Sequence, residues 1–211
     1  AEFDQLKQES LTSFDNERSE PQSVAFRAIS TAFNKYPKGD IRYSATLDED
    51  IADTKAVTLD DVKKFHKDFY GASTGELAIV GDFDESLITP LVSDLFGPWK
   101  SPRSFKRIPS EYFDIAPVNK SFETPDKANA FFIARLNLKM RQDNPDFAAF
   151  TLGDFMLGGG FLNSRLAVRI RQKEGISYGV GSQFNASSLD ESGSLLAFAI
   201  YAPENVERLE A

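Results

Sequence analysis

A proline-rich, basic stretch near the middle of the chain constrains the fold more than any other feature of the sequence. Its four prolines are Pro98, Pro102, Pro109 and Pro117, and the residues around them follow neither a helical nor an alternating period. Proline fixes its φ angle and lacks a backbone N–H, so no continuous helix or central strand can run through such a stretch. We therefore predict a linker over residues 98–120, which separates residues 1–97 from residues 121–211.

The first unit is predicted to be mainly helical. Apolar residues recur every three or four positions over residues 3–14, 21–36 and 58–69, and Asp84 precedes a further apolar repeat that contains Pro90. Pro90 predicts a kink or a later helix start at Thr89. Between the last two helices, Leu77 to Val80 form a short apolar run bounded by glycines, which predicts a buried strand over residues 76–81.

The second unit is predicted to run strand, helix, helix, strand, strand. Residues 130–138 alternate in a two-residue period, with Phe132 and Leu136 on one face and Phe131 and Arg135 on the other. A helix is expected from Asn144 to the glycines at 158–160 and another over residues 163–173, followed by a hairpin of residues 176–184 and 195–201. The predicted fold class is α+β, with two sandwich-like units, each a mainly antiparallel or mixed sheet with helices packed on one face.

Composition excludes several classes of function. The chain has one histidine and no cysteine, so it cannot form a thiolate zinc site or a two-histidine metal site by itself, and we predict no metal ligands in it. A net charge of −8 disfavours nucleic acid as a partner, and no apolar run is long enough to span a membrane. The polar start and the abrupt end suggest a piece of a longer protein.

Some motifs have a simpler structural explanation. Gly71, Ser73 and Gly75 match the G-x-S-x-G pattern of serine hydrolases, but a helix precedes the serine and a strand follows it, which is the reverse of the order that the nucleophile requires. His66 is expected to be structural, because no partner for it lies nearby in the sequence. The acidic run over residues 48–53 lacks the spacing of a calcium loop and indicates a solvated helix start.

Two features remain as candidate sites. Gly158, Gly159 and Gly160 could end a helix, or could expose backbone to an extended ligand. Arg171 and Tyr178 flank Gly175, which is predicted to fold the helix end back toward the strand, so that both side chains point past one end of the sheet. A guanidinium and a phenol in that arrangement can bind carbonyl oxygens. The alternative is a helix-end cation beside a hairpin aromatic with no such role.

Several stretches together resemble the pitrilysin or insulinase family of zinc metallopeptidases. They are residues 157–166 (LGGGFLNSRL), 171–178 (RQKEGISY), 65–71 (FHKDFYG) and 78–84 (AIVGDFD). The similarity extends over nearly the whole chain. The family's H-x-x-E-H zinc motif cannot be written with one histidine, so the resemblance is to the noncatalytic carboxy-terminal half. It implies the end of one α+β domain in residues 1–97 and most of a second in residues 121–211.

The resemblance implies a function for the complete protein. This chain would bind a peptide or protein substrate and close a chamber around it, while zinc is held by the other half or by a partner subunit. Arg171 would hold the peptide backbone, Tyr178 would stabilise the tetrahedral intermediate, and Gly158, Gly159 and Gly160 would contact substrate. The isolated chain would be inactive. The alternative is a scaffold or core subunit without catalysis. Bacterial relatives suggest the periplasm, although the sequence itself leaves the compartment open.

Overall fold

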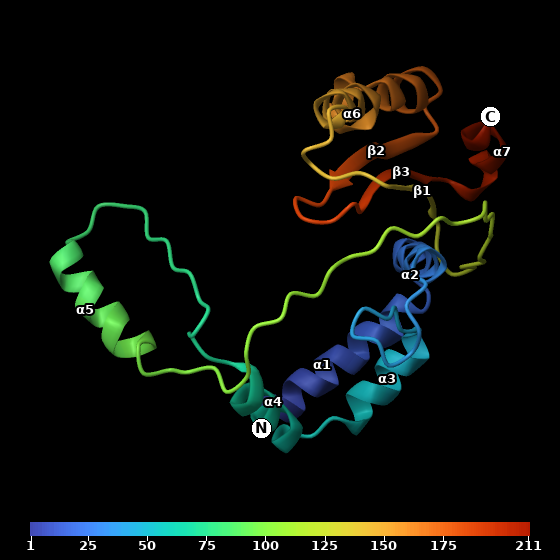
Figure 1. Ribbon diagram of the computed structural model, residues 1–211. Helices are drawn as coiled ribbons and strands as arrows, with labels where there is room; N and C mark the ends of the chain where they lie inside the picture. Colours follow the sequence, from blue (N-terminus) through green and yellow to red (C-terminus); the bar gives the residue numbers. More distant parts are fainter.

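The computed structural model describes all 211 residues and shows an α+β protein, as predicted (Figure 1). The helices of the first unit are α1 (Glu2–Glu17), α2 (Pro21–Phe33), α3 (Leu47–Ala56), α4 (Leu59–Phe69) and α5 (Glu85–Phe96). The elements of the second unit are β1 (Ala130–Leu138), α6 (Phe147–Asp154), η1 (Phe155–Gly159), η2 (Phe161–Asn163), η3 (Ala167–Lys173), β2 (Ser177–Ala186), β3 (Gly193–Tyr201), η4 (Pro203–Asn205) and α7 (Val206–Glu210).

Three helices of the first unit, α3, α4 and α5, begin at residues whose side chains cap them. The hydroxyl of Thr58 accepts a hydrogen bond from the backbone N–H of Asp61 at 3.2 Å, and the Asp61 carboxylate accepts one from the Thr58 N–H at 2.9 Å. This reciprocal pair satisfies two donors that a helix start leaves free. Asp84 caps α5 through the N–H of Ser86 at 2.8 Å. The predicted start signals of α4 and α5 are therefore confirmed.

A three-stranded antiparallel sheet forms the centre of the second unit. The strand order is β1-β3-β2, so β3 is paired on both sides. The register places Phe131 opposite Ile200 and Phe132 opposite Ala199, which confirms the predicted alternation of β1. The hairpin between β2 and β3 is also confirmed.

Helices cover both faces of this sheet, whereas the sequence predicted helices on one face. On one face, the ring of Phe184 lies 5.7 Å from that of Phe147 and 5.3 Å from that of Phe150 in α6. On the other face, Phe26 of α2 lies 5.7 Å from Phe131 between ring centroids. The second layer comes from the first unit, since α2 packs against β1 (Figure 1).

The predicted linker residues 98–120 contain no helix or strand, and hydrogen bonds attach them to both units. Lys35 donates to the carbonyl oxygen of Asp114 at 2.8 Å, and the Tyr36 hydroxyl accepts from the N–H of Glu111 at 2.8 Å. Arg107 forms an ion pair with Asp190, in the turn between β2 and β3, at 2.7 Å. The linker thus contacts the end of α2 and the far hairpin turn.

Three predictions of local structure differ from what is observed. Residues 76–81 form no strand, because no other segment lies beside them to complete a ladder. The helix α5 begins at Glu85 and continues through Pro90, since a proline in the second turn removes only one intrahelical hydrogen bond. The helix α6 begins at Phe147, and Asn144 instead accepts the N–H of Asp146 at 2.9 Å in the turn before it.

Glu49, at the start of α3, has an unusually well-bonded carboxylate. It accepts from Lys38 at 2.6 Å, from the Tyr43 hydroxyl at 3.0 Å and from the Thr46 N–H at 2.9 Å. These hydrogen bonds, the one from Lys38 above all, lower the pKa of Glu49 from 4.5 to about 2. The ionised form therefore stabilises the fold.

This carboxylate predicts an acid-dependent loss of stability. Because the folded pKa lies below the unfolded one, the contribution is complete above about pH 4.5 and is lost as the pH falls toward about 2. In Glu49→Gln, urea midpoints measured by circular dichroism should fall less steeply over this window than in the wild type. Glu76→Gln is the control, because Glu76 lies in an irregular segment, and its profile should match the wild type. Equal slopes for Glu49→Gln and the wild type would contradict the prediction.

Candidate functional site

A β-bulge at the start of β2 positions Tyr178. Ser177 lies opposite Tyr201 and Gly179 lies opposite Ile200, so Tyr178 is an extra residue on β2. The Ser177 hydroxyl donates to the Gly179 carbonyl at 3.0 Å across the bulge. Bulges of this kind redirect one side chain relative to its strand. The Tyr178 side chain is 65% exposed.

This bulge corrects one detail of the predicted strand. A strand with regular alternation over residues 176–184 would place Ile176 and Tyr178 on the same face, but Ile176 is buried while Tyr178 is exposed. The extra residue breaks the two-residue period between them. The phenol is therefore directed toward solvent and does not pack in the core.

Arg171 lies beside the backbone of Tyr178. Its Nη1 donates to the backbone carbonyl of Tyr178 at 3.1 Å. Gly175, at φ +67°, allows the reversal between η3 and β2, because this left-handed conformation favours glycine. The contact reaches the tyrosine backbone and leaves the phenol free. It occupies one of the five guanidinium N–H groups, so the others remain available to a ligand.

The π-helical segment η3, which carries Arg171, is attached to its neighbours near its C-terminal end. Gln172 donates to the carbonyl of Leu162 at 2.8 Å, which links η3 to η2. Glu174 forms ion pairs with Arg169 at 3.1 Å and with Arg208 of α7 at 3.2 Å. These contacts limit how far the arginine can move relative to β2.

The three glycines occupy different environments. Gly158 is buried against β2, and a Cβ added there would lie 2.2 Å from the backbone nitrogen of Ser182. Gly159 is exposed and Gly160 half-buried at the end of η1. Gly158 thus allows close backbone approach between η1 and the sheet. A substrate contact at this loop stays a prediction.

Two features near these glycines were not identified from the sequence. Phe161 has a φ of +51°, which is rare for a bulky residue, and its side chain is 74% exposed. Ser182 donates to the carboxylate of Asp154 at 2.6 Å, which ties the end of α6 to β2. Neither has a local signal, because the first depends on backbone strain and the second joins residues far apart in the chain.

His66 and Ser73, two of the positions given structural explanations, show no catalytic arrangement. The His66 ring stacks on Tyr70 at 5.0 Å and lies 5.9 Å from the Trp99 ring. The Ser73 hydroxyl accepts a hydrogen bond from the backbone N–H of Ser101 at 2.9 Å. This bond holds the segment that follows α5 beside the turn that follows α4. The helix before Ser73 is present and no strand precedes it, so no nucleophile elbow is formed.

The donor set of this chain does not fit a zinc ion. No three side chains of histidine, cysteine, aspartate or glutamate lie close enough together to hold a metal. Zinc sites in proteins need three or four such ligands around one point.

None of the helices combines the length and apolar character that crossing a membrane requires.

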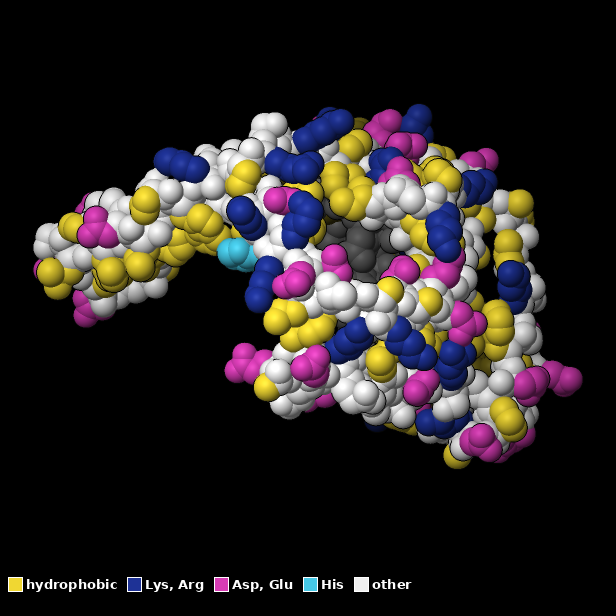
Figure 2. Space-filling model, turned by 90° about the horizontal axis from the view of Figure 1, so that it is seen from below, with side chains coloured by type: hydrophobic (Ala, Val, Ile, Leu, Met, Phe, Trp, Pro, Cys, Tyr) yellow, Lys and Arg dark blue, Asp and Glu magenta, His cyan; other side chains and the backbone are white.

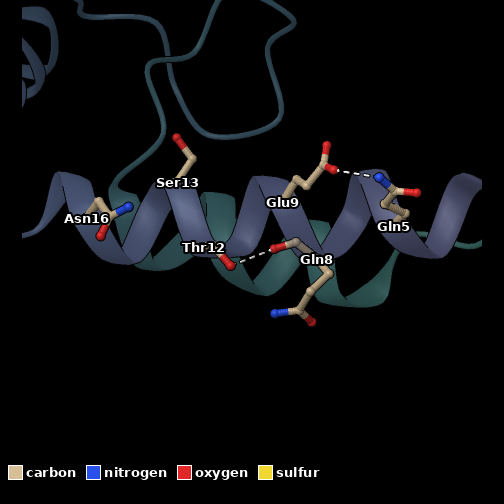
Figure 3. Close-up of a pocket in the computed structure, with 6 residues that line it drawn as sticks. All are labelled: Gln5, Gln8, Glu9, Thr12, Ser13 and Asn16. Atoms are coloured by element: carbon tan, nitrogen blue, oxygen red, sulfur yellow. Dashed lines mark hydrogen bonds between the residues drawn. The ribbon is translucent and has the colours of Figure 1, made fainter.

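Two hollows lie away from Arg171 and Tyr178. Figure 3 shows one on the outer side of α1, where all six lining residues are polar and come from this single helix. The other, of about 260 Å³, lies between α2, the linker and the sheet, and contains Arg135. Burial lowers the pKa of Arg135, whose guanidinium lies over the Phe33 ring at 5.5 Å and donates to Asn137 at 3.1 Å.

Comparison with known families and structures gives one family match. Residues 56–211 match the family model described as peptidase M16 inactive domain. No curated protein sequence is detectably similar. The family match covers the helices α4 and α5, the linker and the whole second unit, including Arg171 and Tyr178.

Solved structures share the fold at low sequence identity. A peptidase M16 inactive domain from Pseudomonas fluorescens is 23% identical with a TM-score of 0.70, over 99% of this chain and 49% of its own. A protease from Helicobacter pylori is 20% identical with a TM-score of 0.71, over 98% and 50%. The periplasmic protease PqqL from Escherichia coli is 17% identical with a TM-score of 0.67, over 98% and 22%. The chain thus spans about half the length of the first two.

The close approach at Gly158 predicts a sharp difference between two glycine substitutions. Gly158→Ala should destabilise the fold by about 2–3 kcal/mol, because the new methyl group would meet strand backbone that cannot move aside. Gly153→Ala, in α6 with open space around its Cβ, should stabilise it by about 0.5–1 kcal/mol. Urea denaturation measures both changes. Equal effects from the two substitutions would show that η1 does not press on β2.

Proposed function

This chain belongs to the peptidase M16 inactive-domain family, and from that premise we propose that it is the noncatalytic part of a zinc-dependent endopeptidase. In this role it binds a peptide substrate and closes the chamber in which the substrate is cleaved. The zinc is held by another half of the protein or by a partner subunit, since the donor set of this chain does not fit the metal. The isolated chain is inactive.

The observation that supports this proposal is the pairing of Arg171 with Tyr178. The guanidinium is anchored to the Tyr178 carbonyl at 3.1 Å, and the phenol beside it is exposed. Arg171 can donate its remaining N–H groups to the carbonyl oxygens of an extended peptide. Tyr178 can donate its O–H to an oxygen on which negative charge develops during peptide-bond cleavage.

The loop that follows η1 extends this surface. Gln172, the neighbour of Arg171, donates to the carbonyl of Leu162, so the loop and the arginine belong to one connected unit. Gly159 and Phe161 are both exposed there. We assign peptide contact to this loop. Gly158 is buried and packs against Ser182 of β2, on the side of the loop that faces the sheet.

The cellular compartment that we propose rests only on similarity to a solved structure. One of the solved structures with this fold is described as a periplasmic protease. We propose the periplasm for the complete protein on that basis. A catalytically inactive scaffold subunit is the competing function, and the kinetic test below separates the two.

Replacement of Tyr178 by phenylalanine in the complete protein tests the proposal. Because the lost O–H acts mainly on the transition state, kcat for a fluorogenic peptide should fall about 10²-fold while KM changes little. Tyr112→Phe, in the linker, is the matched control and should keep wild-type kinetics. Wild-type kinetics in Tyr178→Phe would remove Tyr178 from the mechanism. Absence of any zinc-dependent peptidase activity in the wild type would favour the scaffold.

A further inference from the structure

The hollow of about 260 Å³ between α2, the linker and the sheet contains a positive charge that no acidic side chain balances. The Nε of Arg135 donates to Asn137 at 3.1 Å, whereas Nη1 and Nη2 donate to no protein atom and no carboxylate forms an ion pair with them. The side chain is half-buried, and burial alone lowers its pKa. Because a partly buried charge without a counterion is unfavourable, this guanidinium favours an anionic ligand.

Other charged side chains of the protein have partners of opposite sign. Figure 2 shows Lys and Arg side chains interspersed with Asp and Glu side chains on one face of the body of the molecule. Two arginines close to the hollow follow this pattern, because Arg42 is paired with Asp40 at 2.8 Å and Arg107 with Asp190 at 2.7 Å. Arg135 differs from both in having no carboxylate partner.

The hydrogen-bonding groups that line the hollow are mostly free donors. Hydroxyl groups that donate to no protein atom belong to Ser30, Ser44, Ser110, Tyr112 and Ser192. The acceptors are already engaged. The Oδ1 of Asn34 accepts from the Tyr36 N–H at 2.9 Å, and Glu111, the one carboxylate of the lining, accepts from Arg42 at 3.3 Å. Free donors beside engaged acceptors suit a ligand with acceptor oxygens.

Aromatic rings form the apolar part of the walls. Phe33, Tyr112 and Phe113 are half-buried there, and the Phe33 ring lies 5.5 Å from the Arg135 guanidinium. The hollow is also held in shape, since the Asn137 amide donates to the Phe113 carbonyl at 3.1 Å and ties the linker to β1. Flat apolar walls beside one positive charge suit a planar ligand with an apolar part.

We propose that this hollow binds a small monocarboxylate with an aromatic or apolar stem. The two carboxylate oxygens accept parallel hydrogen bonds from Nη1 and Nη2 of Arg135, and the stem lies against the aromatic walls. One unpaired positive charge balances one negative charge, whereas the second charge of a phosphate would face Glu111. The site does not depend on the roles of Arg171 and Tyr178.

Isothermal titration calorimetry of the complete protein with benzoate tests the site. The volume corresponds to about nine water molecules, and benzoate has a similar number of non-hydrogen atoms. Benzoate should bind at pH 7 with a Kd of about 1 mM or lower. Benzamide, which has nearly the same shape and no charge, and inorganic phosphate should each bind at least about 10-fold more weakly. Absence of benzoate binding would overturn the proposal, and so would equal or tighter binding of benzamide or phosphate.

A matched pair of arginine substitutions tests whether benzoate binds in this hollow. Arg165 also has no ion-pair partner, but it is exposed and lies outside the hollow. In the complete protein, Arg135→Gln should weaken benzoate binding at least about 10-fold, whereas Arg165→Gln should leave it unchanged. Undiminished binding in Arg135→Gln would overturn the proposal. If Arg135→Gln does not fold, Arg135→Lys decides: it keeps the charge without the two parallel donors and should weaken binding at least about 3-fold, and unchanged binding would contradict the proposal.

Discussion

The pairing of β3 with a strand on each side is the interaction on which the rest of the second unit depends. It fixes the register of both neighbours, so an extra residue in β2 becomes a bulge that turns Tyr178 outward. It also provides the flat backbone surface at Ser182 against which Gly158 can rest. A shift of β3 by one residue would exchange the two faces and remove both arrangements.

The same sheet joins the two units, because each contributes one of its covering layers. The face that carries Phe184 is covered by α6, whereas the face that carries Phe131 is covered by α2 from the other side of the linker. Residues 1–97 and 121–211 therefore meet through apolar packing as well as through the chain that connects them. By contrast, α4 and α5 of the first unit do not pack on the sheet.

Local patterns in the sequence predicted most of the helices and strands. The caps at Thr58 and Asp84, the alternation of β1 and the Arg171 and Tyr178 pair all depend on residues close together in the chain. The errors involve distant partners. The strand at 76–81 needs a neighbour that this chain does not provide, and the bulge at Tyr178 is defined only by its register with β3.

The attachment of the linker to both units has a mechanical consequence. A free tether of this length would let the two units swing apart with little resistance. Here the contacts of Lys35 with Asp114 and of Arg107 with Asp190 pin the tether at separate points. Any hinge-like opening that frees the linker must therefore break these contacts as well as the packing of α2 on β1, so the two units are held together at several separate points.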